Sequence, residues 1–104
     1  MDETTFNALT DAVLADLESR LEASGADVDF EFASAGVFEI ECPDRSKVIV
    51  NRHGAAQEIW VAAKSGGFHF RLTDGRWVDT RDGTELFAKL AAVLSQQCGE
   101  AVSL

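Results

Sequence analysis

The feature that most constrains the fold is the stretch 51–70, which reads as the end of one strand, a loop, a second strand, a Ser-Gly-Gly turn at 65–67 and the start of a third strand. Bulky β-forming residues alternate with other residues on both sides of this turn, which is typical of a β-hairpin. In the first arm, Ile59 and Val61 point to one face and Trp60 to the other. If Ile59 and Val61 face the core, the large Trp60 side chain faces solvent and needs a functional explanation.

The same alternation continues on both sides of this hairpin, with turn residues between the runs. It predicts five or six antiparallel strands with short connections. The expected strands cover residues 26–33, 37–42, 47–52, 58–62, 68–72 and 76–78.

Two amphipathic helices are expected to flank the strands. Over residues 4–24, apolar side chains recur at spacings of three and four, which gives one apolar stripe. A second helix is expected to end at Gly99, with Asp82 as its N-cap, because Glu85 follows three residues later as in a capping box.

The helices each carry one apolar stripe and the sheet one apolar face. The simplest solution is a two-layer α+β sandwich in which both helices cover the same face of an antiparallel five- to six-stranded sheet. No repeat or linker interrupts the chain, so residues 1–104 are expected to form a single domain. Trp60 is expected on the open face, whereas Trp77 is the better candidate for a structural tryptophan.

A net charge of −9 limits the classes of partner. Nucleic acids and anionic lipid membranes both select for clusters of Lys and Arg, so neither is an expected partner. The charge favours cations or a basic protein surface. Solubility alone is a competing explanation for an acidic chain.

The cysteines and the N-terminus point to the cytoplasm. The first residues are acidic and polar, unlike a secretory leader, and no apolar run reaches membrane-spanning length. Cys42 and Cys98 are 56 positions apart and have no metal-ligand spacing. We expect both to be reduced and to be packed as small apolar residues.

No sequence motif indicates an enzyme. The chain lacks a nucleophile elbow, a phosphate-binding loop, a dinucleotide fingerprint and a zinc-protease motif. His53 and His69 are isolated in their segments. His69 lies between two phenylalanines that face the other way, so we expect it on the open sheet near Trp60, as a surface or interface residue rather than a catalytic one.

Carboxylates form the one cluster with recognisable chemistry. Three of them share a face of the first helix, and three project from one side of the first strand. Carboxylate oxygens suit hard cations, but no fixed ligand spacing is present, so binding is expected to be weak and shallow. A solvated acidic face is the alternative. The six candidate metal ligands are Asp11, Glu18, Glu22, Asp27, Asp29 and Glu31.

These residues, together with the central segment, resemble the frataxin family, in particular its bacterial members. The resemblance spans nearly the whole chain. It is carried by Asn51-Arg52, Ile59-Trp60-Val61-Ala62, Lys64, Gly66-Gly67-Phe68-His69-Phe70, Gly36, Trp77, Arg81-Asp82-Gly83 and Gln96-Gln97-Cys98-Gly99-Glu100.

The resemblance implies both a fold and a function. The expected fold is an α–β–α sandwich with both helices on one sheet face. The expected function is that of an iron-binding protein in iron–sulfur cluster assembly, which donates or senses iron and regulates the complex of a cysteine desulfurase with a scaffold protein. Iron (Fe²⁺ or Fe³⁺) would bind weakly to the acidic residues, with no organic cofactor; pyridoxal phosphate belongs to the desulfurase.

The resemblance also implies a partner-binding surface, formed by Asn51, Glu58, Trp60 and His69. Glu58 stands where the family commonly has Gln, which is expected to add a negative charge to this docking face. A monomer is expected, with an iron-dependent oligomer as the alternative. Two other functions stay open: a weak ferroxidase using the same carboxylates, and an acidic interaction module in which metal binding is incidental.

Overall fold

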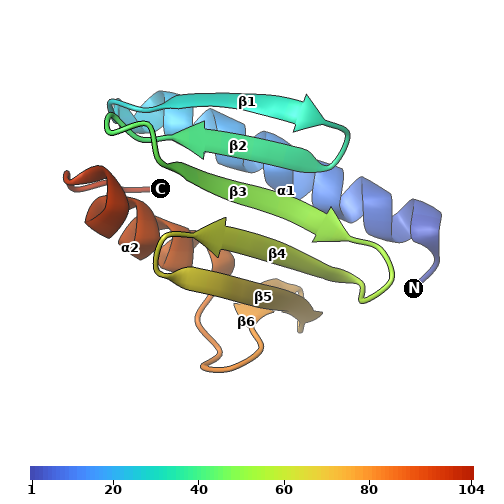
Figure 1. Cartoon of the computed structure of the whole chain (residues 1–104). Helices are drawn as coiled ribbons and strands as arrows, with labels where there is room; N and C mark the ends of the chain where they lie inside the picture. Colours follow the sequence, from blue (N-terminus) through green and yellow to red (C-terminus); the bar gives the residue numbers. More distant parts are fainter.

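The computed structural model describes all 104 residues. Six strands form one antiparallel sheet in which each strand pairs with the next in sequence, and both helices lie behind it in Figure 1. This arrangement confirms the predicted two-layer fold. The elements are α1 (Glu3–Ser24), β1 (Asp29–Ser34), β2 (Val37–Glu41), β3 (Lys47–His53), β4 (Glu58–Ala63), β5 (Gly66–Thr73), β6 (Arg76–Asp79) and α2 (Leu86–Cys98).

The core lies between the helices and one face of the sheet. Alternate residues of the central strands, such as Ile40, Val50 and Ile59, are fully buried there, as the alternation predicted. Trp77 is only 7% exposed and its ring meets Phe6 of α1 edge to face, with centroids 6.2 Å apart. Trp77 is therefore the structural tryptophan. Neither helix combines the length and apolar character needed to cross a membrane.

The start of α2 corrects the expected N-cap. Glu85, not Asp82, caps this helix, because its carboxylate accepts hydrogen bonds from the backbone N–H groups of Phe87 and Ala88. The carboxylate of Asp82 accepts from the N–H of Thr84 instead, and it also pairs with the Lys89 ammonium at 2.8 Å. These contacts lower the pKa of Asp82 to about 2, with the Lys89 bond as the largest cause.

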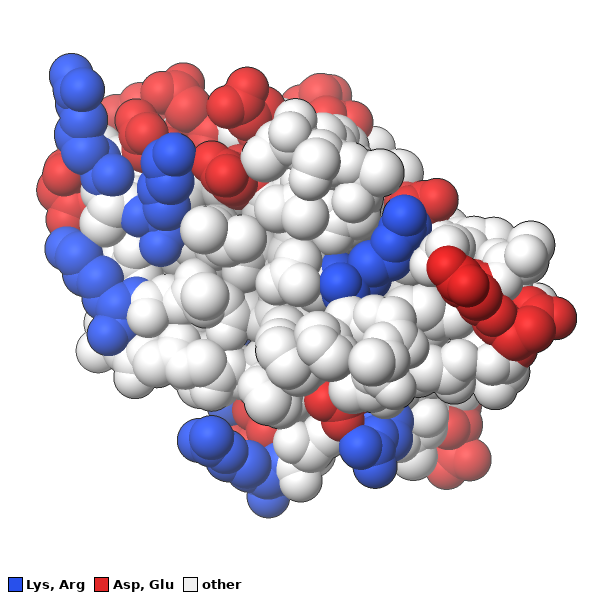
Figure 2. Space-filling model, turned by 45° about the vertical axis from the view of Figure 1, so that its right-hand side comes forward, with Lys and Arg blue, Asp and Glu red and all other residues white.

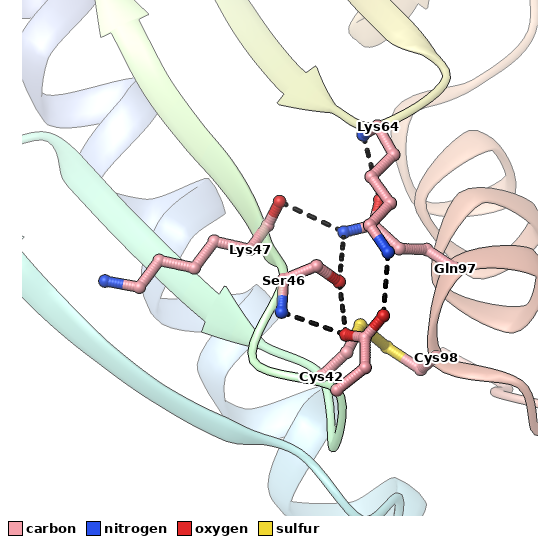
Figure 3. A network of polar contacts seen from close by, with 7 residues as sticks. Cys42, Ser46, Lys47, Lys64, Gln97 and Cys98 are labelled. Atoms are coloured by element: carbon pink, nitrogen blue, oxygen red, sulfur yellow. Dashed lines mark hydrogen bonds and ion pairs between the residues drawn. A yellow bond between two sulfur atoms is a disulfide. The ribbon is translucent and has the colours of Figure 1, made fainter.

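The two cysteines are joined, so the prediction of two free thiols is wrong. Cys42 follows β2 and Cys98 is the last residue of α2, and the fold places their Cα atoms 4.9 Å apart, where they form a disulfide (Figure 3). This distance suits a disulfide. The contact depends on how α2 packs across the sheet, which sequence spacing alone cannot show.

A close approach at the β1–β2 turn ties the sheet to α1. Gly36 has a φ of +73°, and a Cβ atom there would lie 2.5 Å from Nε of Arg52. The Arg52 side chain passes over this glycine and its Nη1 donates to the Asp11 carboxylate on α1. The turn therefore needs glycine both for its backbone conformation and for the space that Arg52 occupies.

We expect Gly36→Ala to destabilise the protein more than Gly25→Ala. Gly25 also has a positive φ, of +68°, but no atom lies within 4 Å of its Cβ direction. Both changes force a residue with a Cβ into the left-handed region, at a cost of about 1 kcal/mol. Gly36→Ala must also displace Arg52, which we expect to lower the free energy of unfolding by roughly 1 kcal/mol more. Urea unfolding measures the difference, and equal losses would contradict it.

Candidate functional site

Three stacked aromatic rings stand on the open face of the sheet. Trp60 of β4 lies between His53 of β3 and His69 of β5, with ring centroids 3.7 Å and 4.5 Å from its own and both interplanar angles at 10°. Trp60 is half-buried and His69 is exposed. The expected position of Trp60 on this face, with His69 beside it, is confirmed. We call these three residues the aromatic patch.

Strand register produces the stack. Trp60 pairs directly with His69 on one side and with Asn51 on the other, so these side chains rise from the same sheet face. His53 reaches the indole diagonally, because its own direct partner is Glu58. The loop after β3 holds the His53 ring in place, since the backbone N–H of Ala56 donates to its Nδ1 at 3.2 Å.

Glu58 lies beneath the aromatic patch and is only 5% exposed. The expected added charge on the surface is therefore corrected: the carboxylate is buried and paired. Its Oε1 accepts from Nε1 of Trp60 at 2.9 Å, its Oε2 accepts from Nη2 of Arg71 at 2.6 Å, and Nδ1 of His69 lies 3.6 Å from Oε1. The Trp60 bond is the largest influence lowering the pKa of Glu58, and Arg71 and His69 add to it.

This carboxylate orients the indole. The indole N–H of Trp60 donates to the Glu58 carboxylate. This bond fixes the ring orientation, with one face stacked on His53 and the other on His69. A buried charge is tolerated only when it is paired and hydrogen-bonded, and here Arg71 and Trp60 supply both. The patch thus presents aromatic surface with little free negative charge.

The candidate metal ligands do not converge on one point. No group of three or more Asp, Glu, His or Cys side chains is placed to hold a metal ion. Asp11 is engaged by Arg52, at 2.5 Å, and lies two helical turns from Glu18. Figure 2 shows acidic side chains gathered along the upper edge of the molecule.

Two carboxylates that are not among the six predicted ligands, Glu39 and Glu41, lie beside Asp29 and Glu31. Antiparallel pairing places Glu41 opposite Asp29 and Glu39 opposite Glu31, so four carboxylates share one sheet face. They line an open groove of about 300 Å³ together with Phe30 and Lys47. The sequence carries the signal for this arrangement: Glu39 and Glu41 alternate with the apolar Phe38 and Ile40, and the tight Ser-Ala-Gly turn at 34–36 brings their strand back beside the first one.

Lys47 is the one cation in this groove. Its ammonium lies 3.0 Å from Oε1 of Glu39. Glu39 is the main cause that raises the pKa of Lys47, and Glu41 and Glu31 contribute at longer range. Like charges that face each other across two strands repel, so Lys47 offsets only part of an unfavourable arrangement. The carboxylates of Asp29, Glu31 and Glu41 have no ion-pair partner.

Comparison with known proteins identifies the family. Residues 1–100 match the sequence model of the frataxin-like domain. The chain belongs to the frataxin family. The iron-sulfur cluster assembly protein CyaY of Dechloromonas aromatica is 58% identical over 104 residues, covering 100% of this chain and 99% of that protein. The CyaY protein of Cupriavidus metallidurans is 48% identical over 107 residues, covering 100% and 96%.

Solved frataxin structures share the fold. A frataxin from Psychromonas ingrahamii superposes with a TM-score of 0.91 at 31% identity, covering 99% of this chain and 97% of that one. The trimeric frataxin of Saccharomyces cerevisiae, complexed with ferrous iron, has a TM-score of 0.69 at 29% identity, covering 96% and 88%. The frataxin fold expected from the sequence is thereby confirmed.

The hydrogen bonds from Trp60 and Arg71, which lower the pKa of Glu58 in this frataxin-family chain, predict a pH-dependent stability. A carboxyl group whose pKa is lowered by folding stabilises the folded state above its ordinary value of 4.5, and this contribution is lost as pH falls through the lowered pKa. We expect Glu58→Gln to reduce the free energy of unfolding at pH 7 and to differ less from the wild type near pH 3. Urea unfolding at both pH values measures this, with the exposed Glu31→Gln as the control.

Proposed function

We propose that this chain acts in iron–sulfur cluster assembly as an iron-binding regulator of a cysteine desulfurase–scaffold complex in the bacterial cytoplasm. The observation that carries the proposal is the full-length similarity to relatives that are named as iron-sulfur cluster assembly proteins. The aromatic patch gives that role a physical basis, and so does the acidic surface, by which we mean the carboxylates of α1 and of residues 27–31. Both are side-chain arrangements suited to binding rather than to bond-making chemistry, so we propose a regulator and not an enzyme.

Iron is proposed to bind along the acidic surface formed by α1 and β1. Carboxylate oxygens are suitable ligands for ferrous and ferric ions, which are harder than the metals that select thiolates. The yeast relative was crystallised in complex with ferrous iron. Because the carboxylates are spread out, we propose weak and exchangeable binding, as a donor or sensor requires. The proposed ligands are Asp11, Glu18, Glu22, Asp27, Asp29 and Glu31, with Glu39 and Glu41 added from the groove.

The protein partner is proposed to dock on the aromatic patch. A large aromatic ring that becomes desolvated at an interface is a typical energetic hot spot. Trp60 is held in one orientation by Glu58, so little side-chain entropy is lost on binding. Asn51 and His69 flank it on the neighbouring strands. The net charge of −9 would speed the approach to a basic partner surface.

Metal titration tests the iron assignment. We expect Co²⁺ or Mn²⁺ to perturb the NMR signals of the acidic surface and to raise the melting temperature, because bound cations relieve repulsion between carboxylates. The double variant Glu18→Gln/Glu22→Gln should bind more weakly. The control Glu3→Gln/Asp74→Asn removes the same charge at two positions outside the proposed ligands and should bind normally. Perturbation confined to His53 and His69 would refute the assignment.

Two tryptophan variants test the docking surface. We expect Trp60→Ala to lower the free energy of unfolding by ~1 kcal/mol, whereas Trp77→Ala should cost roughly 3–5 kcal/mol as a core change. Affinity for the desulfurase–scaffold complex should fall by about 2 kcal/mol, or roughly 30-fold, in Trp60→Ala. It should also fall as ionic strength rises. Normal binding by folded Trp60→Ala would remove the patch as the docking site.

A further inference from the structure

The disulfide lies where three structural elements meet. Cys42 is 3% exposed and Cys98 is half-buried at the end of α2. Beside it, Nε2 of Gln97 donates to Oγ of Ser46 and to the carbonyl of Lys47, at 3.0 and 3.1 Å, and its Oε1 accepts from the backbone N–H of Lys64 (Figure 3). The disulfide therefore joins the β2–β3 turn to α2 covalently, and the hydrogen bonds of Gln97 join both of these to the β4–β5 turn.

The chain after the disulfide reaches the acidic surface. Gly99 ends α2, and two residues past Cys98 the Glu100 carboxylate accepts a hydrogen bond from the backbone N–H of Asp27 at 2.7 Å. Val102 is 6% exposed and its N–H donates to Oγ of Ser95. The disulfide thus anchors the base of the tail, residues 99–104. This tail contacts the segment before β1 at Asp27, a proposed iron ligand.

We propose that Cys42–Cys98 is a reversible thiol–disulfide site whose reduction loosens the tail and the Asp27 end of the acidic surface. The site would react with thiols and disulfides, and its state would alter the geometry available to a bound cation. The link to iron rests on the proposed function. The thiol–disulfide site itself rests on the geometry of this region, together with the proposed cytoplasmic location.

The exchange chemistry follows from the exposure of the two residues. A thiolate of a dithiol reductant attacks Sγ of Cys98, the more exposed cysteine, and forms a mixed disulfide while Cys42 leaves as a thiolate and takes up a proton. The second thiolate of the reductant then displaces Cys98, which is protonated in turn. Two electrons pass to the protein and the reductant becomes a disulfide. A disulfide oxidant reverses both steps.

Contacts around the bond allow it to open without unfolding the chain. Leu90 and Leu94 hold α2 in the core at 0% exposure, and the three hydrogen bonds of Gln97 remain when the sulfurs separate. The tail keeps the hydrogen bonds of Glu100 and Val102 and the packing of Val102 and Leu104 on the core, but it loses the covalent anchor at its base. Disulfides of proteins in the bacterial cytoplasm are mostly transient or redox-sensing, which favours a reversible bond over a permanent cross-link.

Hydrogen exchange of the oxidised and reduced protein tests the proposal. Dithiothreitol should expose two thiols per folded chain, and amide exchange should quicken at residues 99–104 and 27–29 but not in the β3–β4 hairpin. The melting temperature should fall by about 10 °C or more, as expected for opening a long closed loop. Cys42→Ser/Cys98→Ser should reproduce the reduced protein and should not respond to dithiothreitol.

Three results would overturn parts of the proposal. If thiols appear only when the chain unfolds, or if exchange at 99–104 is the same in both forms, the thiol–disulfide site is refuted. If Co²⁺ binds with equal affinity to both forms, the coupling to the cation site is refuted; we expect a difference of about threefold or more, or roughly 0.7 kcal/mol. If neither form binds Co²⁺ while exchange still differs, the iron assignment and the coupling fail and the thiol–disulfide site stands.

Discussion

The register of the antiparallel sheet is the constraint on which the rest of the molecule depends. Side chains alternate between the two faces, so one pairing decides at once which residues form the core and which form the aromatic patch. A slip of one residue in β4 would bury Trp60 and expose Ile59 and Val61. The helices reinforce the observed register because their apolar stripes fit only the face that carries the aliphatic residues. The same strand register therefore determines both the core and the candidate site.

The side chains on the open face are also held in defined orientations, because the buried carboxylate of Glu58 bonds to its neighbours. Glu58 is shielded from water, and its two oxygens accept hydrogen bonds that hold the indole of Trp60 and the guanidinium of Arg71 in place. This arrangement replaces a solvated charge with a paired one. The surface that results has defined side-chain orientations, which suits recognition by a protein partner.

Local patterns in the sequence predicted most of the fold, and failures occurred where long-range packing decides. The alternation of Ile59, Trp60 and Val61 was enough to place the tryptophan on the open face. It could not show that Trp60 and Arg71 lie over Glu58 and bury it. The pairing of Cys42 with Cys98 depends on where α2 crosses the sheet, and spacing carries no signal for that contact.

The position of β1 at the edge of the sheet has a consequence for solubility. β1 pairs only with β2, so its outer backbone groups have no partner strand and offer a template on which a second chain can align. The negative charges of Asp29 and Glu31 at this edge repel an identical edge from another copy. The carboxylates proposed to bind cations thus also oppose strand-to-strand aggregation, and neutralising them would weaken that protection.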